Sequence, residues 1–436
     1  MKKLNVVLGD CYHDSDKGGG GIISGALVAI KEVCQEREIE PQITLLYRFS
    51  QDDPRFATAS RLTKELFPEV SVAPALLSTL HGPHIFWALW AIKALILGPL
   101  TLLFPSLNSQ TAVLKEADLI ILKGGHFYRT WSKNPLLDAI AIYLLTYNIL
   151  FAYRLGKPLA VLSHSFGPFQ TPLSKRLFGW IISKASYLST REEISKTILQ
   201  SCAVPGDKIN VTPDLAFAAF AKETDRIKQI MLVQGLKENS YIIVTARPWF
   251  FSASNWKESQ AYEAYTNALA ELCRYTIETK GKTIVLVVQN DGAHSKKEPD
   301  ILPLKAIQSK IARQEVVLIE DDLNAAELIY LYQRAFFTLG TRLHSCIFSF
   351  TVGTPCIAVA YTHKADGIMK MMEAAEFVLD INNIDLQRGK AMIDTLSNSR
   401  PELSQRYYQR AGQLRAEVIN AMHTIFMKIY TVHKIG

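Results

Sequence analysis

One strand–helix–strand unit in the last quarter of the chain constrains the fold most. An apolar strand at Ala335–Leu339 runs into Gly340, and Arg342 and His344 follow directly. The pattern then becomes helical and returns to an apolar strand at Cys356–Ala360. Short apolar strands joined by a helix are typical of a parallel α/β sheet. The unit therefore predicts a doubly wound α/β domain.

Cationic side chains gather at the carboxyl ends of these two strands. Arg342 and His344 follow the first strand, and Lys364 stands just beyond the second. Ligands of open α/β sheets bind at this edge, beside helix N-termini that favour anions. We predict a site for a small anionic substrate there, with Arg342 and His344 catalytic and with Lys364 and Gly340 in contact with the ligand. The alternative makes Arg342 a surface ion-pair partner and His344 a structural residue.

Strands alternate with helices along the rest of the chain, in two series. The length of 436 residues favours two domains over one. The predicted fold class is α/β, with two doubly wound Rossmann-like domains facing a cleft. We expect an N-terminal domain at 1–230 that binds a second substrate, a C-terminal domain at 231–400 that binds the anion, and a final helix at 401–436 that packs back across the interface.

A run of four glycines, Gly18–Gly21, lies between the strand Leu4–Leu8 and a helix expected at Ile22–Glu36. Glycines at such a place let the backbone approach a ligand closely, and we predict that Gly18 and Gly19 contact substrate. The run lacks the spacing of a dinucleotide fingerprint or a P-loop. A plain flexible turn is the alternative.

Other glycines follow the middle strands of the N-terminal series. Gly124 and Gly125 end a buried strand, and Gly167 follows the next one. All three are predicted to contact substrate, and tight turns are the alternative. His126 and His164 also lie near these strand ends, where each is either a substrate contact or a hydrogen-bonded structural histidine.

Arg191 directly follows the strand Tyr187–Thr190. It is predicted to bind the anionic substrate. It could instead form an ion pair with Glu192 or Asp214, and Asp214 itself has only the features of a loop residue or helix cap.

The most apolar run of the chain is residues 85–104. Its length approaches that of a membrane span, but Lys93 and the Gly98-Pro99 break argue against a clean one. We expect either a buried or surface-docked helical hairpin, or a hydrophobic patch that rests on the inner face of the membrane.

Charge and cysteine content exclude several classes of function. The net charge of +7 fits an anionic ligand or membrane surface, and the lack of a dense basic tract argues against nucleic acid. The six cysteines form no C-x-x-C pair, which argues against zinc and disulfides and indicates the cytoplasm. Asp321-Asp322 precedes a helix near Asn324, so we interpret it as a capping element and expect no metal.

Several motifs, in this order and spacing, resemble those of the polysaccharide pyruvyl transferase family, of the exopolysaccharide and colanic-acid type. Besides the glycine-rich first loop, the matching pieces are Asp118-Leu-Ile-Ile-Leu-Lys-Gly-Gly125, Ser165-Phe-Gly-Pro-Phe169, Thr190-Arg-Glu-Glu-Ile-Ser195, Thr212-Pro-Asp214, Gly340-Thr-Arg-Leu-His344, Gly353-Thr-Pro355 and Tyr361-Thr-His-Lys364. They span residues 1 to about 375.

The resemblance implies a GT-B-like fold and transfer of a pyruvyl group from phosphoenolpyruvate to sugar hydroxyls of a polysaccharide or its lipid-linked precursor, as a ketal. It implies that Arg342, His344 and Lys364 form the phosphoenolpyruvate site and adds Arg191 to it. No metal or cofactor is implied, since the cations are those of the protein.

One departure from the family pattern concerns the acceptor. Members usually carry Gly-Asp in the first loop, whereas Gly18–Gly21 supplies no acid, and Asp16 or Asp10 would have to replace it. Two other functions stay open: a nucleotide-sugar glycosyltransferase of GT-B fold, and a non-catalytic binding protein of polysaccharide biosynthesis.

Overall fold

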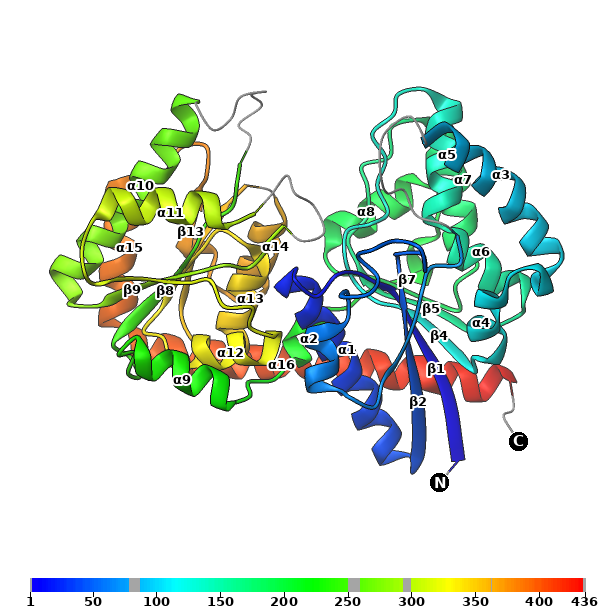
Figure 1. Ribbon diagram of the computed structural model, residues 1–436, viewed down its shortest axis with the longest axis horizontal. Helices are drawn as coiled ribbons and strands as arrows, with labels where there is room; N and C mark the ends of the chain where they lie inside the picture. The colour runs from blue at the N-terminus through cyan, green and yellow to red at the C-terminus, as the bar shows by residue number, and fades with distance from the viewer. Residues whose placement is uncertain (1, 78–86, 250–258, 293–298, 362, 434–436) are drawn as a thin grey trace. The chain divides into compact units, whose positions relative to one another are not determined.

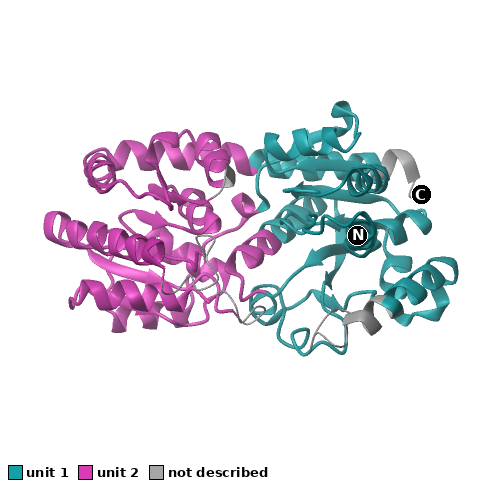
Figure 2. Cartoon of the chain, turned by 90° about the horizontal axis from the view of Figure 1, so that it is seen from above, with its two compact units in different colours: residues 1–13, 25–215, 416–436 teal, residues 14–24, 216–415 magenta. Residues whose placement is uncertain are grey.

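The computed structural model divides the chain into two compact units (Figure 2). Unit 1 comprises residues 1–13, 25–215 and 416–436, and unit 2 comprises residues 14–24 and 216–415. The structure describes residues 2–77, 87–249, 259–292, 299–361 and 363–433.

The division between the units differs from the boundary expected at residue 230. It lies after residue 215, because the segment that follows already bonds to unit 2: the Lys222 N–H donates to the Ala326 carbonyl. The early segment 14–24, which contains the four glycines, is also part of unit 2.

The described residues of unit 1 form a seven-stranded parallel sheet of order β3-β2-β1-β4-β5-β6-β7 (Figure 1). Every residue of its central strand β4 is buried, as expected for a parallel strand covered on both faces. The strands are β1 (Lys2–Cys11), β2 (Ile39–Tyr47), β3 (Ser71–Ala73), β4 (Leu119–Leu122), β5 (Leu159–His164), β6 (Tyr187–Thr190) and β7 (Ile209–Val211).

Helices connect these strands and pack on the sheet. The α-helices are α1 (Lys17–Glu36), α2 (Arg61–Leu66), α3 (Trp87–Leu103), α4 (Ala112–Glu116), α5 (Pro135–Leu145), α6 (Tyr147–Arg154), α7 (Pro172–Ile182) and α8 (Glu193–Ser201). Short 3₁₀ turns are η2 (Pro105–Leu107), η3 (Ser109–Thr111), η4 (Gly206–Lys208) and η5 (Leu215–Ala218).

Unit 2 contains a six-stranded parallel sheet of order β10-β9-β8-β11-β12-β13, counted over its described residues. Its strands are β8 (Tyr241–Thr245), β9 (Thr283–Val287), β10 (Val316–Ile319), β11 (Thr338–Gly340), β12 (Cys356–Ala360) and β13 (Val378–Asp380). Its helices are α9 (Asp225–Val233), α10 (Gln260–Lys280), α11 (Ile301–Ile311), α12 (Ala325–Gln333), α13 (Leu343–Thr351), α14 (His363–Met371), α15 (Leu386–Asn398) and the 3₁₀ turn η7 (Ala375–Phe377).

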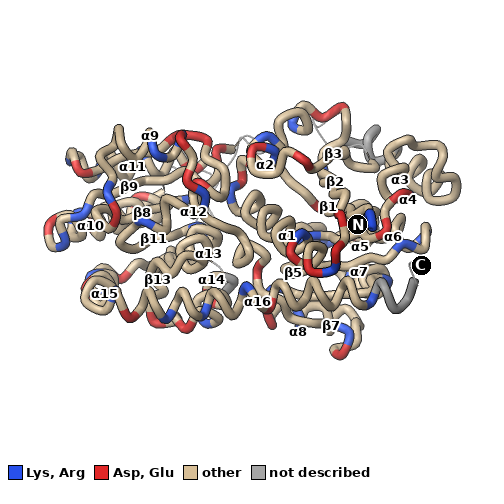
Figure 3. The backbone as a smooth tube through the Cα atoms, turned by 90° about the horizontal axis from the view of Figure 1, so that it is seen from below, with Lys and Arg blue, Asp and Glu red and all other residues tan. Residues whose placement is uncertain are grey.

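The last helix, α16 (Arg400–His433), belongs to unit 2 up to Arg415 and to unit 1 from Ala416. Both basic and acidic residues occur along it (Figure 3). One apolar face of the helix is buried, and its side chains are Tyr407, Ala411, Leu414, Val418 and Ile425.

The hairpin expected at residues 85–104 is not formed. Residues 85 and 86 lie outside the described part of the chain, and the rest forms the single helix α3 with Pro99 inside it. None of the described helices is by itself long and apolar enough to cross a membrane; only the pair α5 and α6, bent by 58°, passes by length and composition.

Candidate functional site

The direction of strand order reverses at one place in each sheet. In unit 2 the reversal lies between β8 and β11, and in unit 1 it lies between β1 and β4. In doubly wound sheets the crevice at such a switch point is where ligands bind. The motif Gly340–His344 follows β11, so the predicted anion site lies at the switch point of unit 2.

Arg342 is the N-cap residue of α13, and its guanidinium binds Asp300. Its Nε donates to both carboxylate oxygens, at 3.1 and 3.2 Å, and Nη2 also donates to Oδ1. Although burial opposes the charged form, the Asp300 carboxylate raises the pKa of Arg342 above its ordinary value. Asp300 therefore orients one edge of the planar guanidinium and keeps Arg342 positively charged.

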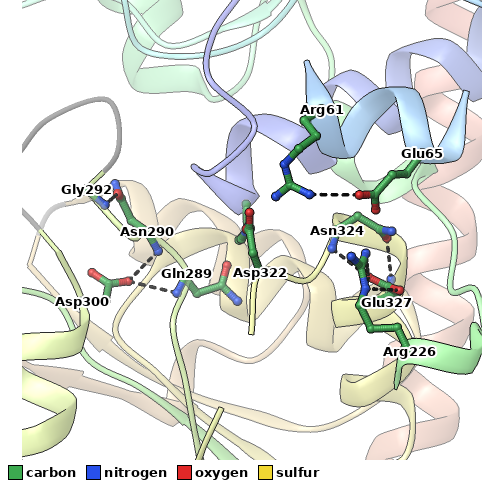
Figure 4. Close-up of polar contacts among 11 residues, drawn as sticks. Arg61, Glu65, Arg226, Gln289, Asn290, Gly292, Asp300, Asp322, Asn324 and Glu327 are labelled. Carbon is green, nitrogen blue, oxygen red and sulfur yellow. Dashed lines mark hydrogen bonds and ion pairs between the residues drawn. The ribbon is translucent and has the colours of Figure 1, made fainter. Parts of the chain in front are cut away.

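Asp300 is completely buried and is held by more than Arg342. Its Oδ2 accepts the backbone N–H groups of Gln289 at 3.2 Å and Asn290 at 3.1 Å, which Figure 4 shows. Burial raises the pKa of Asp300, and the neighbouring Arg342 opposes that rise. No sequence motif marked this residue, because its partner is distant in the chain.

A chain of buried polar side chains lies beneath the start of α13. The Gln289 amide donates to the Tyr332 hydroxyl at 2.9 Å, and that hydroxyl is 2.7 Å from Ser345 Oγ. Thr245 Oγ1 donates to Ser345 Oγ at 3.1 Å and accepts the Thr341 N–H at 3.1 Å. This network anchors the backbone on both sides of Arg342, so the side chain starts from a fixed position.

His344 lies in the first turn of α13, and its ring packs against Gly18. A Cβ on Gly18 would overlap the imidazole, and a Cβ on Gly21 would overlap the ring of Phe348. The prediction of a loop at Gly18–Gly21 is therefore wrong: the glycines form the first turns of α1, where they allow a close approach to α13. Whether Gly18 and Gly19 contact substrate stays a prediction.

The first turn of α1 is fastened to unit 2 at its start. The Lys17 N–H donates to the Gln289 carbonyl at 3.0 Å, and its ammonium forms an ion pair with Asp322. The N-termini of α1 and α13 thus approach each other at the switch point, and both expose the positive end of a helix dipole. This arrangement suits an anion.

The capping role predicted for Asp321-Asp322 is wrong. Asn324 caps α12 in a capping box with Glu327, whose carboxylate also binds Arg226 (Figure 4). Asp322 instead pairs with Lys17.

A small hollow opens beside Arg342, lined among others by Gly340, Leu343 and Tyr361. The Arg247 guanidinium stacks on the Tyr361 ring at 4.2 Å, which adds a second cation at this edge. Sequence reasoning missed Arg247 as a site residue, although it follows the apolar run of β8 (Tyr241–Thr245) by two residues. Arg247 lies at the same edge as Arg342 because β8 and β11 are neighbours in the sheet. The sequence does not show this pairing.

The predicted role of Lys364 stays a prediction. Its backbone lies in the first turn of α14, but its side chain lies outside the described part of the structure.

In unit 1, Arg191 lies in a closed network of hydrogen bonds. Its side chain donates to Asp214 Oδ2 and Ser165 Oγ, both at 2.7 Å, and to Glu192 Oε2 at 3.3 Å. Only 3% of the residue is exposed. These contacts match the alternative in which Arg191 forms ion pairs with Glu192 and Asp214. Through Ser165, Arg191 also holds the segment that follows β5 in position.

The three predicted glycines of unit 1 have structural reasons of their own. A Cβ on Gly124 would lie 2.5 Å from the Ser163 carbonyl oxygen, so glycine is required where β4 meets β5. Gly125 forms a bridge to His164, and Gly167, at φ +72°, accepts a hydrogen bond from the His126 ring at 2.6 Å. Their contact with substrate stays a prediction.

A second polar cluster lies at the switch point of unit 1. Asp10 is fully buried and accepts hydrogen bonds from the Tyr128 hydroxyl at 2.5 Å and from Arg48 at 2.9 Å. His164 Nε2 lies 3.7 Å from the same carboxylate, and burial lowers the pKa of this histidine well below its ordinary value. Because Asp10, Tyr128 and His164 are all fully buried, the cluster joins the ends of β1 and β5 from within the unit.

No group of three or more His, Cys, Asp or Glu side chains with a metal-binding arrangement occurs among the described residues.

Comparison with known proteins relates the chain to one family and one fold. The family model described as polysaccharide pyruvyl transferase matches residues 38–363. The amylovoran biosynthesis protein AmsJ of Erwinia amylovora is 23% identical over 390 residues, which cover 87% of this chain and 89% of AmsJ.

Solved structures with similar folds have far lower sequence identity. The UDP-GlcNAc 2-epimerase of Methanocaldococcus jannaschii superposes with a TM-score of 0.56 at 12% identity, covering 91% of this chain and 93% of the epimerase. Anabaena Alr3699/HepE in complex with UDP gives 0.55 at 13% identity, covering 99% and 100%. These likenesses, with the two parallel sheets, confirm the predicted fold class of two Rossmann-like domains, GT-B-like.

Proposed function

Because the chain belongs to the polysaccharide pyruvyl transferase family, we propose that it transfers a pyruvyl group from phosphoenolpyruvate to two hydroxyls of a saccharide. The product is a ketal, and inorganic phosphate is released. The acceptor is a polysaccharide or its lipid-linked precursor, an assignment supported by the similarity to an amylovoran biosynthesis protein. The proposal needs no cofactor or metal.

The observation that carries the proposal is the convergence of Arg342, His344 and the N-terminus of α1 at one switch point. Phosphoenolpyruvate has a carboxylate and a phosphate on adjacent groups, so it needs several positive groups close together. Arg342 has a guanidinium edge oriented by Asp300, and Arg247 lies near it on the neighbouring strand end. The amides at two helix N-termini favour anions in the same place.

Ketal formation proceeds by proton transfer and two additions. Protonation of the methylene carbon of phosphoenolpyruvate leaves an oxocarbenium-like C2, and one sugar hydroxyl adds there with loss of its proton. Phosphate then leaves by cleavage of the C2–O bond, and a second hydroxyl adds to C2. Two hydroxyl protons are released in total. One replaces the proton that was added to the methylene carbon, and the other is taken up by the released phosphate.

We assign the proton transfer to His344 and the binding of the anion to Arg342, with Lys364 as a further contact. A histidine is the side chain best suited to move protons near neutral pH. Arg191 is not given direct contact with the anion, since its donors are already bound by Asp214, Glu192 and Ser165.

The acceptor is assigned to unit 1, which carries the second switch point. Support comes from the switch point itself, where the buried cluster of Asp10, Tyr128 and His164 fixes the segments that follow β1, β4 and β5. Asp10 is an acid in the region where the family pattern has one. We place the reaction in the cytoplasm, which is supported by six buried free cysteines.

The test measures phosphate release from phosphoenolpyruvate with saccharide and lipid-linked saccharide acceptors. Arg342→Ala and His344→Ala are expected to lower the rate by at least about a hundredfold, the usual effect of losing an electrostatic or acid–base group. Matched controls are Arg274→Ala on α10 and His423→Ala on α16, whose side chains pair with Glu271 and Glu36. Equal rates in all four variants would refute the roles assigned to Arg342 and His344.

A nucleotide-sugar glycosyltransferase is the rival, because UDP is present in several structures of similar fold. The melting temperature of the protein separates the two functions. A pyruvyl transferase is expected to be stabilised by phosphoenolpyruvate and not by a UDP-sugar, and inorganic phosphate should compete with phosphoenolpyruvate for the site. Binding of neither ligand would favour a non-catalytic role.

A further inference from the structure

Helix α3 presents a broad apolar surface outside the core of unit 1. Its exposed side chains occupy the side of the helix opposite Ala94 and Thr101 and continue into the turn η2, so they form one broad stripe. Between 37% and 66% of each of these residues is exposed: Ile92, Leu95, Ile96, Leu97, Leu100, Leu103, Phe104 and Leu107. Soluble surfaces rarely carry so many large apolar side chains together, so the stripe calls for a partner.

The opposite side of α3 is firmly packed, so the stripe is a fixed surface. A Cβ on Gly98 would overlap the Tyr143 hydroxyl, and the Tyr147 hydroxyl donates to the Gly98 carbonyl at 3.0 Å. Ala94 is buried as well. The helix therefore packs against α5 and α6 at Gly98, and the large side chains of the stripe lie on its outer side.

The charge of the surrounding chain is strongly positive. Among residues 94–190, the charged side chains that are not buried are eight Lys or Arg and two Asp or Glu, a net charge of +6. From Ala94 to Asn108 no charged residue occurs, and Lys93 is the one charged residue in the sequence of α3; the tube of Figure 3 draws Lys and Arg in blue and Asp and Glu in red along the rest of the chain. An apolar stripe within a basic region is complementary to an anionic lipid surface.

Aromatic side chains next to cations occur at other exposed points of unit 1. Trp131 is 71% exposed, and the Arg129 guanidinium lies 4.8 Å from its ring centre. Lys184 lies 4.7 Å from the ring of Trp180, which is also exposed. Tryptophan beside a basic group is typical of the headgroup region of a bilayer.

From this combination we infer that unit 1 binds the surface of a bilayer containing anionic phospholipids through the apolar stripe of α3. The helix lies parallel to the membrane, because its apolar part is shorter than a span. A second copy of the chain is a weaker occupant, since two such regions would bring net positive charges together. The inference does not depend on the proposed reaction.

Co-sedimentation with vesicles tests it. The full chain is expected to bind vesicles of phosphatidylethanolamine with phosphatidylglycerol, to bind phosphatidylcholine vesicles less, and to be released by salt. Ile96→Asp combined with Leu103→Asp is expected to lower the partition coefficient roughly a hundredfold, about tenfold for each apolar side chain withdrawn from lipid.

The control places the same charges on an exposed apolar pair elsewhere. Leu232 and Val233 at the end of α9 are 75% and 66% exposed, and Leu232→Asp with Val233→Asp should leave vesicle binding unchanged. Thermal unfolding verifies that both double variants are folded. Vesicle binding that survives the α3 changes, or that both pairs abolish equally, would overturn the inference. So would light scattering that shows the stripe holding a dimer together.

Discussion

Gly18 packs directly against the imidazole of His344, although the two residues are 326 positions apart in the sequence. No other residue type fits at position 18 without moving the ring, because even one methyl group would overlap it. The first glycine of α1 thus determines where the proposed proton-transfer group of α13 lies. Backbone close approach is one of the specific uses of glycine.

Gly18→Ala is expected to displace His344 and lower phosphate release by more than tenfold. Overpacking of this kind costs about 1–3 kcal/mol of stability if the ring does not move. Gly412→Ala on α16, where a Cβ meets nothing within 4 Å, is the matched control and should be neutral or slightly stabilising. Steady-state rates with urea unfolding of both variants check this, and a fully active Gly18→Ala enzyme would contradict it.

Arg342→Lys keeps a positive charge at the anion site but loses the planar fork that Asp300 binds. We expect the KM for phosphoenolpyruvate to rise about tenfold, the effect of roughly 1.4 kcal/mol of lost binding. The measurement compares KM and kcat with those of the wild type. An unchanged KM would show that the fork is not used for binding the donor.

Arg191→Ala is expected to act on stability. It leaves Asp214 and Glu192 without their guanidinium partner in a buried place, which typically costs about 3–5 kcal/mol. Arg191→Lys should recover part of that loss. If both variants unfold at the wild-type urea concentration and have a higher KM for phosphoenolpyruvate, then Arg191 binds substrate directly.

The Glu327 carboxyl is expected to make the free energy of unfolding depend on pH. Burial alone raises the pKa of its carboxyl, but Arg226, Thr224 and the Asn324 N–H outweigh burial and hold it below the usual range. A carboxyl with a depressed pKa stabilises the fold above its unfolded value, about 4.3, and loses that effect as the pH falls through the folded pKa.

Glu327→Gln should therefore reduce stability by about 1–3 kcal/mol at neutral pH, and the difference from the wild type should shrink below pH about 4.3. Urea unfolding across this pH range measures it, with the exposed Glu315→Gln as control. A difference that grows on acidification would contradict the assignment.

Local patterns predicted several elements to the residue. The strands Tyr187–Thr190 and Cys356–Ala360 have the bounds expected from the sequence. Cys356–Ala360 is a short apolar run directly after the turn residues Gly353-Thr-Pro355. The strands Ser71–Ala73 and Val378–Asp380 were missed, since three residues carry too little periodicity to be recognised.

Local sequence patterns could not predict contacts between residues that lie far apart in the chain. Asp300 binds Arg342, and Lys17 binds Asp322, but neither pair is visible from spacing along the chain. Arg247 was visible as a residue after a strand, yet its place beside Arg342 depends on the pairing of β8 with β11. That pairing is set by the order of strands in the sheet.

The sequence by itself determined the alternation of strands and helices and the place of Arg342 and His344 after a strand, since apolar periodicity and glycine breaks are local. Only the tertiary structure decided what surrounds them: the start of α1, the Asp300 carboxylate and the network beneath α13. These contacts join segments that lie far apart in the chain. They exist because the strand order and the close packing of two helices bring those segments to one edge of the sheet.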